Sequence, residues 1–245
     1  MSAVASLRDM LIDLAPEPIK GVVFDFHGTL VGGGDTTRWV DAALRKLAAD
    51  GHPAPELSAA RIVELRDHLD HIWHHAHAID PRSERDLSHE RHRDVFHRTV
   101  ALQGVEPALI TALYDVMPDQ WALFDDTLPV LRELKARGIR IVVLSNIGLD
   151  IRPLLDRAGV GALVDGVVLS YEVGLVKPDP AIYERAVEML GIPGTQTLMV
   201  GDSPRDDVGG VPLGIRTLIL PRTGGTVHGL ATVLQMTGAP ALSAG

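Results

Sequence analysis

Cysteine is absent from this 245-residue sequence, and aromatic residues make up only 4% of it. Without cysteine the chain cannot form a disulfide, a thiolate metal site or a thiol nucleophile. No apolar run approaches the roughly 20 residues that a membrane-spanning helix needs. Near the start, Arg8 and Asp9 stand where a signal peptide would need its apolar stretch. We therefore expect a cytoplasmic protein without a membrane partner.

Basic residues are also few, with 23 lysines and arginines against 32 aspartates and glutamates and a formal net charge of −9. This balance disfavours a nucleic-acid backbone or an anionic membrane surface as the main partner. It does not exclude anionic small molecules, because a cleft can carry a local positive field whatever the net charge. The expected partner is therefore a small molecule, and the chain is a monomer or a homodimer.

Apolar residues, at 46%, are numerous enough for a full core. Four short apolar runs bounded by turn residues suit buried parallel strands better than helices, and a fifth run is weaker. The four are residues 21–26, 139–144, 197–200 and 215–220, and the weaker one is 167–169.

Helices are predicted between these runs. One covers residues 128–137 and ends at Gly138, and another covers 181–190 after Asp179 as N-cap and Pro180 at the first helical position. Alternating strands and helices predict an α/β fold with a three-layer parallel sheet. In such sheets ligands bind beyond the carboxyl ends of the strands, so polar residues at those ends become candidates for chemistry.

The segment 32–121 is far too long for a simple connection between two strands, and its apolar periodicity is helical. We expect an inserted all-helical cap domain over 32–121 and a core made of 1–31 and 122–245. Gly32, Gly33 and Gly34 stand where the insertion leaves the sheet. They suit either a hinge or an ordinary flexible turn.

Four segments carry polar residues at the ends of strands or the starts of helices: FDFHGTL, VLSNIG, VKPDP and VGDSPRDD. Their order resembles the four signature motifs of the haloacid dehalogenase superfamily, from about residue 21 to residue 222. The resemblance implies a Rossmann-like core, hydrolase activity and bound Mg²⁺. Their candidate residues are Asp25, Ser145, Lys177, Asp202, Asp206 and Asp207.

The resemblance implies that Asp25 is the nucleophile and forms an aspartyl-phosphate. Ser145 and Lys177 would stabilise charge on the transferring phosphoryl group. Lysine is rare here, with four lysines against nineteen arginines, so its presence in the third motif is informative. Further phosphate-binding candidates are Gly28, Thr29 and Asn146.

For the metal, Asp202 and Asp25 offer the hard oxygen ligands that Mg²⁺ prefers. The resemblance adds the backbone carbonyl of His27 and the pair Asp206 and Asp207, without deciding which aspartate of the pair matters more. Ordinary structural roles are open for the same residues. Asp25 could end a strand in a turn, and the aspartate pair could form a solvated first helical turn.

His27 departs from the phosphatase pattern, in which the residue two after the nucleophile is usually a second aspartate. An imidazole titrates near pH 6.5 and could serve as general acid and base, or the ring could merely pack while its carbonyl holds the metal. The first hypothesis is therefore a Mg²⁺-dependent phosphatase acting on a small phosphorylated metabolite. The alternative is a catalytically silent phosphate-binding or regulatory protein.

Hydrolysis of a carbon-halogen or carbon-phosphorus bond fits the sequence less well. The dehalogenases of this superfamily carry an aromatic residue at the position of His27 and lack the acidic fourth motif. Phosphonate hydrolases recruit a cap lysine, and the only lysine near the expected cap is Lys46.

The insertion also contains three histidines, His68, His71 and His75, at spacings of three and four residues that predict one helical face. This spacing could bind a transition metal. A solvated or partly packed face and contact with substrate are the other interpretations.

Overall fold

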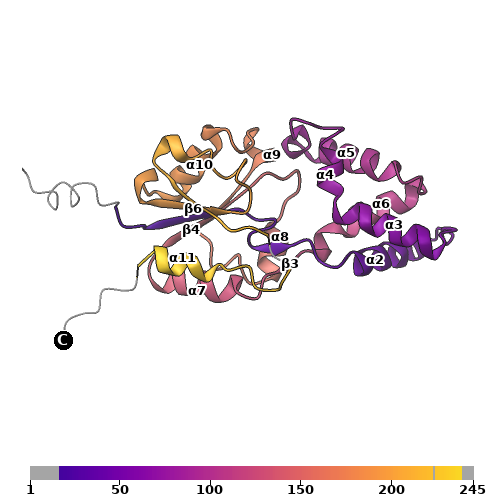
Figure 1. Ribbon diagram of the computed structural model, residues 1–245, viewed down its shortest axis with the longest axis horizontal. Coiled ribbons are helices and arrows are strands. Elements are labelled where there is room, and N and C mark those ends of the chain that lie inside the picture. Colours follow the sequence, from indigo (N-terminus) through magenta and orange to yellow (C-terminus); the bar gives the residue numbers. More distant parts are fainter. Residues whose placement is uncertain (1–16, 223, 239–245) are drawn as a thin grey trace, which may run out of the picture.

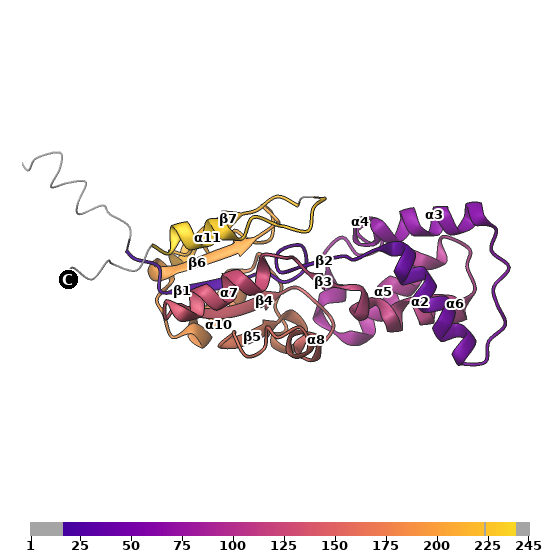
Figure 2. The ribbon, with the colours of Figure 1, turned by 90° about the horizontal axis from the view of Figure 1, so that it is seen from below.

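The computed structural model describes residues 17–222 and 224–238. It has two lobes: one contains a parallel sheet between helices, and the other contains helices alone (Figure 1, Figure 2). In the described part of the chain, no helix has the length and apolar character to cross a membrane. The positions Arg8 and Asp9, on which the signal-peptide prediction rests, lie outside the described residues.

The sheet lobe is built on five strands in the order β5-β4-β1-β6-β7, with every neighbouring pair parallel. The predicted α/β fold is therefore confirmed. Each predicted apolar run overlaps one of these strands, with ends shifted by at most two residues. The strands are β1 (Gly21–Phe24), β4 (Arg140–Ser145), β5 (Gly166–Leu169), β6 (Thr197–Gly201) and β7 (Arg216–Ile219).

Helices connect the strands much as predicted. In α10 the Asp179 carboxylate accepts a hydrogen bond from the amide of Ala181 at 3.0 Å, and Pro180 opens the helix. The core helices are α7 (Thr127–Ala136), α8 (Arg152–Arg157), α9 (Ser170–Val173), α10 (Pro180–Leu190) and α11 (Ala231–Met236), with 3₁₀ turns η3 (Gly194–Gln196) and η4 (Val211–Leu213).

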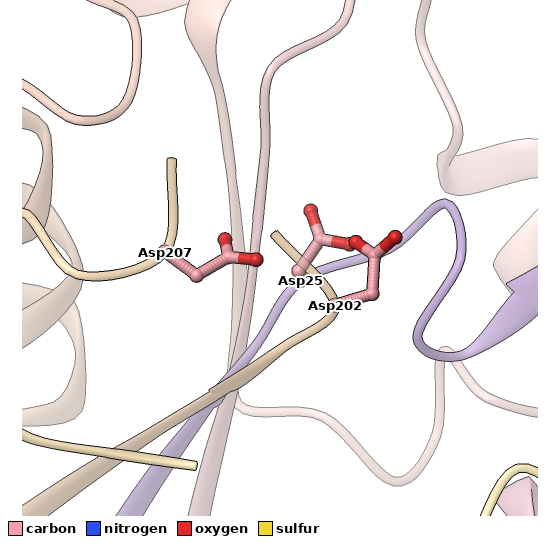
Figure 3. A group of neighbouring side chains, drawn as sticks. All are labelled: Asp25, Asp202 and Asp207. Atoms are coloured by element: carbon pink, nitrogen blue, oxygen red, sulfur yellow. The ribbon is translucent and has the colours of Figure 1, made fainter. Parts of the chain in front are cut away.

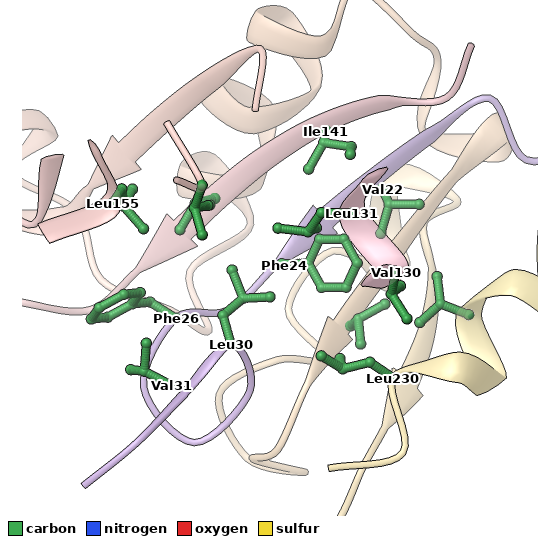
Figure 4. Close-up of a cluster of buried hydrophobic side chains, with 14 of the residues drawn as sticks. Val22, Phe24, Phe26, Leu30, Val31, Val130, Leu131, Ile141, Leu155 and Leu230 are labelled. Carbon is green, nitrogen blue, oxygen red and sulfur yellow. The ribbon is translucent and has the colours of Figure 1, made fainter. Parts of the chain in front are cut away.

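Side chains alternate along β1 and bury both faces of the sheet. Val22 and Phe24 pack in the cluster that includes Leu131 of α7, on the face that Figure 4 shows. Val23 points the other way and packs with Tyr183 of α10. Burial on both faces fixes the register of the central strand, and with it the position of the residue that follows it.

The second lobe has an apolar core of its own, which includes Trp39, Leu65, Phe96 and Leu113. Its elements are α2 (Thr36–Ala49), α3 (Ala59–Asp70), α4 (Ile72–Ala76), η1 (Glu84–Leu87), α5 (His89–Ala101), α6 (Pro107–Val116) and η2 (Met117–Gln120). All of them fall within the predicted insertion. We call this lobe the cap, and its function as a cap stays a prediction.

Two short antiparallel strands, β2 (Val31–Gly32) and β3 (Ala122–Leu123), join the lobes. Gly34 beside them has a φ of +78°, and a Cβ there would lie 2.0 Å from the carbonyl oxygen of Gln120. Only glycine fits such a close approach of two backbones. The hinge hypothesis for this segment stays a prediction.

The three cap histidines lie on two consecutive helices, yet their rings gather as the predicted face requires: the His75 ring lies 4.4 Å from His68 and 6.4 Å from His71. Helix α3 ends at Asp70, and the amide of His71 bonds to the carbonyl of His68 at 3.2 Å in a tighter turn. A single turn residue therefore separates the helix that carries His68 from the helix that carries His75.

Candidate active site

The candidate site lies at the carboxyl ends of the central strands. Asp25 directly follows β1, Ser145 ends β4, and Asp202 directly follows β6. Because β4 and β6 flank β1, three segments that are far apart in the sequence meet at one sheet edge. A cavity of about 430 Å³ opens there. From the sheet lobe, predicted site residues lining it are Asp25, His27, Ser145, Asn146, Lys177, Asp202, Asp206 and Asp207.

Lys177 bridges two buried carboxylates in this cavity. Its Nζ atom lies 2.6 Å from Oδ1 of Asp25 and 2.7 Å from Oδ1 of Asp207. All three side chains are almost fully buried. Burial alone would lower the pKa of Lys177, but Asp25 and Asp207 raise it above its usual value. The lysine is therefore a fixed positive charge beside the candidate nucleophile.

Asn146 and Thr29 hold this arrangement in place. The side-chain amide of Asn146 donates to the carbonyl of Lys177 at 3.0 Å and accepts from its amide at 2.7 Å. The Thr29 hydroxyl donates to Oδ2 of Asp25 at 3.0 Å. These hydrogen bonds orient Lys177 and Asp25, and the phosphate binding predicted for Asn146 and Thr29 stays a prediction.

Gly28 is needed for a close approach rather than for lining the cavity. Its φ is +95°, and a Cβ there would lie 2.6 Å from Oδ2 of Asp202. Its amide donates to the carbonyl of Val31 at 2.8 Å. This close packing brings the turn after β1 against Asp202, and the predicted contact of Gly28 with phosphate stays a prediction.

Three carboxylates converge in the cavity. Asp25, Asp202 and Asp207 each offer an oxygen, and these atoms lie within 4.8 Å of one another (Figure 3). An all-carboxylate set of this kind fits a hard cation such as Mg²⁺, which keeps several waters and takes one or two carboxylates plus substrate oxygens. Burial and Asp202 raise the pKa of Asp25 against the opposing effect of Lys177, as expected for crowded carboxylates without a divalent cation.

The two adjacent aspartates of the fourth motif separate in the structure. Asp207 belongs to the converging group, and its Oδ2 accepts from the amide of Ser203 at 2.9 Å. Asp206 lines the same cavity, but its Oδ2 accepts from the hydroxyl of Ser203 at 3.0 Å and it stands outside that group. Of the predicted pair, Asp207 is therefore the better placed to face a metal.

His27 lines the cavity at the edge nearest the cap. The ring is half-buried and stands edge-on to Trp121, with ring centroids 5.8 Å apart. Burial and the nearby Arg222 lower the pKa of His27 to about 4. The imidazole is therefore neutral at pH 7 in the free protein. The metal contact predicted for its backbone carbonyl stays a prediction.

Arg222, which the sequence analysis did not single out, also lines the cavity. Its guanidinium forms an ion pair with Asp202, although 64% of the arginine side chain is exposed. No motif marks this residue, because it follows β7 in a loop whose path depends on tertiary packing.

The cap supplies a wall that sequence analysis also missed. Arg85 and Asp86 line the cavity with their charged groups 3.4 Å apart, and the Arg85 guanidinium lies 5.2 Å from the ring centroid of Trp73. Burial raises the pKa of Asp86 to about 6, and burial lowers the pKa of His92 to about 3. Further cap residues at the cavity are Ser83 and His92.

The cap wall contacts the sheet lobe at α9 and at the loop after β4. The hydroxyl of Ser170 donates to the carbonyl of Asp86 at 2.5 Å and accepts from the amide of Ile147 at 2.8 Å. A Cβ on Gly148 would lie 2.5 Å from Cβ of His92. These contacts position Arg85 and Asp86 opposite the strand ends.

The cap histidines His68, His71 and His75 do not line the main cavity. Nε2 of His68 lies 3.1 Å from the carbonyl of Thr99, and its ring stacks on His75 at 4.4 Å. Within residues 17–222 and 224–238, Asp25, Asp202 and Asp207 form the group of three side chains that could hold a metal ion. His68, His71 and His75 form no such group in these residues. A packed histidine cluster is the interpretation that these contacts favour.

Comparison with known proteins identifies the class. A family model described as haloacid dehalogenase-like hydrolase matches residues 19–211, and the chain belongs to this family of enzymes. The chain is 30% identical over 201 residues to a glyceraldehyde 3-phosphate phosphatase of Methanothermobacter thermautotrophicus, covering 78% of this chain and 80% of that protein. The family predicted from the four motifs is confirmed.

Two further similarities are more limited. A phosphoserine phosphatase of Thermus thermophilus is 33% identical over 105 residues, which is 42% of each chain. The fold resembles the solved structure of a HAD-hydrolase, YfnB of Bacillus subtilis, which was described as bound to magnesium. That likeness has a TM-score of 0.64 at 18% identity and covers 91% of this chain and 100% of the other, so it concerns the fold.

Proposed function

We propose that this protein is a cytoplasmic, Mg²⁺-dependent phosphatase that hydrolyses a small phosphorylated metabolite through an aspartyl-phosphate on Asp25. The observation that carries the proposal is the ion pair between Lys177 and Asp25 inside a buried group of carboxylates. The relatives named as phosphatases support the same reaction class. Nucleic acid is a disfavoured substrate in this proposal, because the formal net charge of −9 opposes binding to a phosphate backbone.

In the first step, a carboxylate oxygen of Asp25 attacks the phosphorus of the monoester. The bond between phosphorus and the alcohol oxygen breaks, and protonated His27 gives its proton to that oxygen. Lys177 and Ser145 stabilise negative charge on the phosphoryl oxygens. A bound phosphate dianion raises the pKa of His27 from its low value in the free protein, which supplies the protonated ring.

In the second step, water attacks the phosphorus of the aspartyl-phosphate. The now neutral His27 takes a proton from that water, and the bond between phosphorus and Asp25 breaks to release inorganic phosphate. His27 is protonated again at the end, so the proton balance of the cycle closes. A neutral imidazole can accept a proton from water, and the His27 ring is already neutral at pH 7 in the free protein.

Asp25, Asp202 and Asp207 are the residues that would hold Mg²⁺. When bound, Mg²⁺ neutralises charge on the phosphoryl group and orients it for in-line attack. The Arg222 guanidinium, paired with Asp202, partly compensates the same carboxylates in the metal-free protein. The backbone carbonyl of His27 remains a candidate metal ligand, and Asp206 remains a candidate for contact with metal-bound water.

The second candidate is a catalytically silent phosphate-binding or regulatory protein of the same fold. The observation that favours it is His27 itself, since a ring with a pKa of about 4 is a weak proton donor at neutral pH. Hydrolysis of carbon-halogen or carbon-phosphorus bonds fits less well, because the converging carboxylates suit a metal and Lys46 pairs with Asp50 on the cap.

The test is phosphate release from sugar phosphates, nucleotides, small alkyl phosphates and an aryl phosphate, with and without Mg²⁺. We expect metal-dependent release that Asp25→Asn abolishes. His27→Ala should lower kcat by about 10² to 10⁴ for alkyl esters, the usual contribution of a positioned acid and base. No release by the wild type, together with release by His27→Asp, would support the silent protein instead.

A further inference from the structure

A second cavity of about 200 Å³ adjoins the main one at the junction of cap and sheet. It is lined by Trp39, Trp73 and Trp121, which are all three tryptophans of the sequence. The two cavities share four lining residues: His27, Trp73, Trp121 and Arg222. We call this second cavity the tryptophan chamber.

His27 stands on the wall that the two cavities share. Its ring is edge-on to Trp121, and its Nε2 atom is 3.8 Å from the position a Cβ would take on Gly33, which lines the chamber. On the other side of the shared wall lie Asp25, Ser145 and Lys177, which line the main cavity and not the chamber. Since His27 borders both spaces, an ester whose phosphoryl group lies at Asp25 would extend its alcohol past His27 into the chamber.

The lining of the chamber combines flat apolar surfaces with a carboxylate, Asp70, that can accept hydrogen bonds from hydroxyl groups. The Nε1 of Trp39 donates to the carbonyl of Leu113 at 2.8 Å, so the indole contributes its carbon surface to the chamber. Oδ2 of Asp70 accepts from the hydroxyl of Thr36 at 3.3 Å. A carboxylate can accept about four hydrogen bonds, so Asp70 retains capacity for ligand hydroxyls. At about 200 Å³, the chamber is smaller than the roughly 300–1,000 Å³ of sites for drug-sized ligands.

Building on the phosphatase function proposed above, we propose that the tryptophan chamber binds the leaving alcohol and that this alcohol is a cyclic polyol, such as a hexose. The carbon face of the ring packs on tryptophan while its hydroxyls donate to Asp70. The alcohol oxygen that leaves phosphorus lies at His27, between the two cavities. Substrates are thus phosphate monoesters of a single hydroxylated ring, rather than of a linear alcohol or a bare aromatic ring.

The chamber can be filled without changing a catalytic residue. Gly33 is exposed, its φ lies outside the positive range, and the nearest heavy atom to an added Cβ is His27 Nε2 at 3.8 Å. Gly33→Leu therefore adds bulk to the chamber without backbone strain. The matched control is Gly224→Leu, at a glycine where an added Cβ meets nothing within 4 Å.

The kinetic test compares three esters: glucose 6-phosphate, ethyl phosphate and benzyl phosphate. Their leaving alcohols are all primary, so they differ mainly in what would enter the chamber. We expect Gly33→Leu to lower kcat/KM for glucose 6-phosphate at least about tenfold more than for ethyl phosphate. A tenfold effect is typical when a pocket loses the space that part of a substrate occupies. Gly224→Leu should change neither. Equal losses on both esters, or a wild-type preference for benzyl over glucose 6-phosphate, would overturn the proposal.

A binding experiment separates failure of this proposal from failure of the proposed function. All three tryptophans line the chamber, so intrinsic fluorescence reports on it. Trp73 and Trp121 also line the main cavity, so inorganic phosphate alone is the control for binding there. In Asp25→Asn, glucose 6-phosphate should change the tryptophan emission, whereas inorganic phosphate alone should change it little. Adding Gly33→Leu should abolish the response to the sugar. An unaltered response in the double variant would overturn the chamber assignment, even if the wild type hydrolyses no ester.

Discussion

The Nζ atom of Lys177 lies 2.6 Å from Oδ1 of Asp25, although 152 residues separate them in the sequence. The pair is possible because β1 occupies the centre of the sheet and the loop before α10 returns to its carboxyl end. Its consequence is a candidate nucleophile that is desolvated but held beside a fixed positive charge. Aspartate in that state can approach an anionic phosphoryl group with reduced repulsion.

Replacing Lys177 by methionine should impair both activity and stability. Without the ammonium, Asp25 and Asp207 remain buried and uncompensated, which typically destabilises a protein by about 3–5 kcal/mol. Phosphate release should fall at least about 10²-fold. Denaturant unfolding and phosphate release measure the two effects, with the exposed Lys135→Met as control. Wild-type activity in Lys177→Met would contradict the proposed charge stabilisation.

The protonation state of His27 can be observed directly. Since burial and Arg222 lower the pKa of His27 to about 4, the ring should be neutral at pH 6 in the free protein. Ring chemical shifts in a pH titration by NMR should show a midpoint near 4. Arg222→Gln should move that midpoint upward, because it removes one of the two lowering effects. A midpoint near 6.5 in the wild type would mean that the ring is solvated like a free histidine.

Removing the Arg222 side chain should also tighten metal binding. Its guanidinium pairs with Asp202, so a cation entering the carboxylate group must compete with it. Because the arginine is largely exposed, the effect should be modest, about threefold to tenfold in the Mg²⁺ dissociation constant. Calorimetric titration of Arg222→Gln with MgCl₂ measures it, and Asp202→Asn should instead weaken binding. Weaker binding in Arg222→Gln would show that the arginine supports the metal site.

Asp86 should make stability depend on pH. Its folded pKa of about 6 is above the unfolded value near 3.9, so the folded protein holds the proton longer. Stability is therefore lost as the pH rises from about 4 to about 6 and then levels off. At about 1.4 kcal/mol per pH unit, Asp86→Asn should be more stable than the wild type by about 2–3 kcal/mol at pH 7, and equally stable below pH 4.

Urea unfolding at a series of pH values measures this difference. Asp94→Asn, on the exposed surface of α5, is the matched control and should show no comparable gain. A wild-type stability that does not fall between pH 4 and pH 6 would contradict the buried setting assigned to Asp86.

Much of the sheet lobe could be predicted from the sequence because its signals are local. Each buried strand is a short apolar run, and Asp179 with Pro180 marks the start of α10. The motif residues Asp25 and Asp202 were placed at one edge because parallel strands end together. The parallel sheet brings these two residues together, and the alternation of strands and helices in the sequence predicts such a sheet.

The rest depends on tertiary contacts that no local pattern records. Arg85 and Asp86 are held at the cavity by a hydrogen bond between the lobes, in which the Ser170 hydroxyl donates to the backbone carbonyl of Asp86. Arg222 does so because of the path of a loop. The turn at His71, which separates α3 from α4, was not predicted, although the rings of His68, His71 and His75 still lie together. Thr29 was predicted to bind phosphate, and its hydrogen bond to Asp25 became visible only with side-chain positions.

The most direct test of the account is to trap the aspartyl-phosphate. The Mg²⁺-loaded protein would be incubated with acetyl phosphate, quenched in acid, digested and analysed by mass spectrometry. We expect a phosphoryl group on the peptide that contains Asp25, and its loss in Asp25→Asn. Phosphate release without any adduct on that peptide, or release that persists in Asp25→Asn, would contradict the assignment of Asp25 as nucleophile.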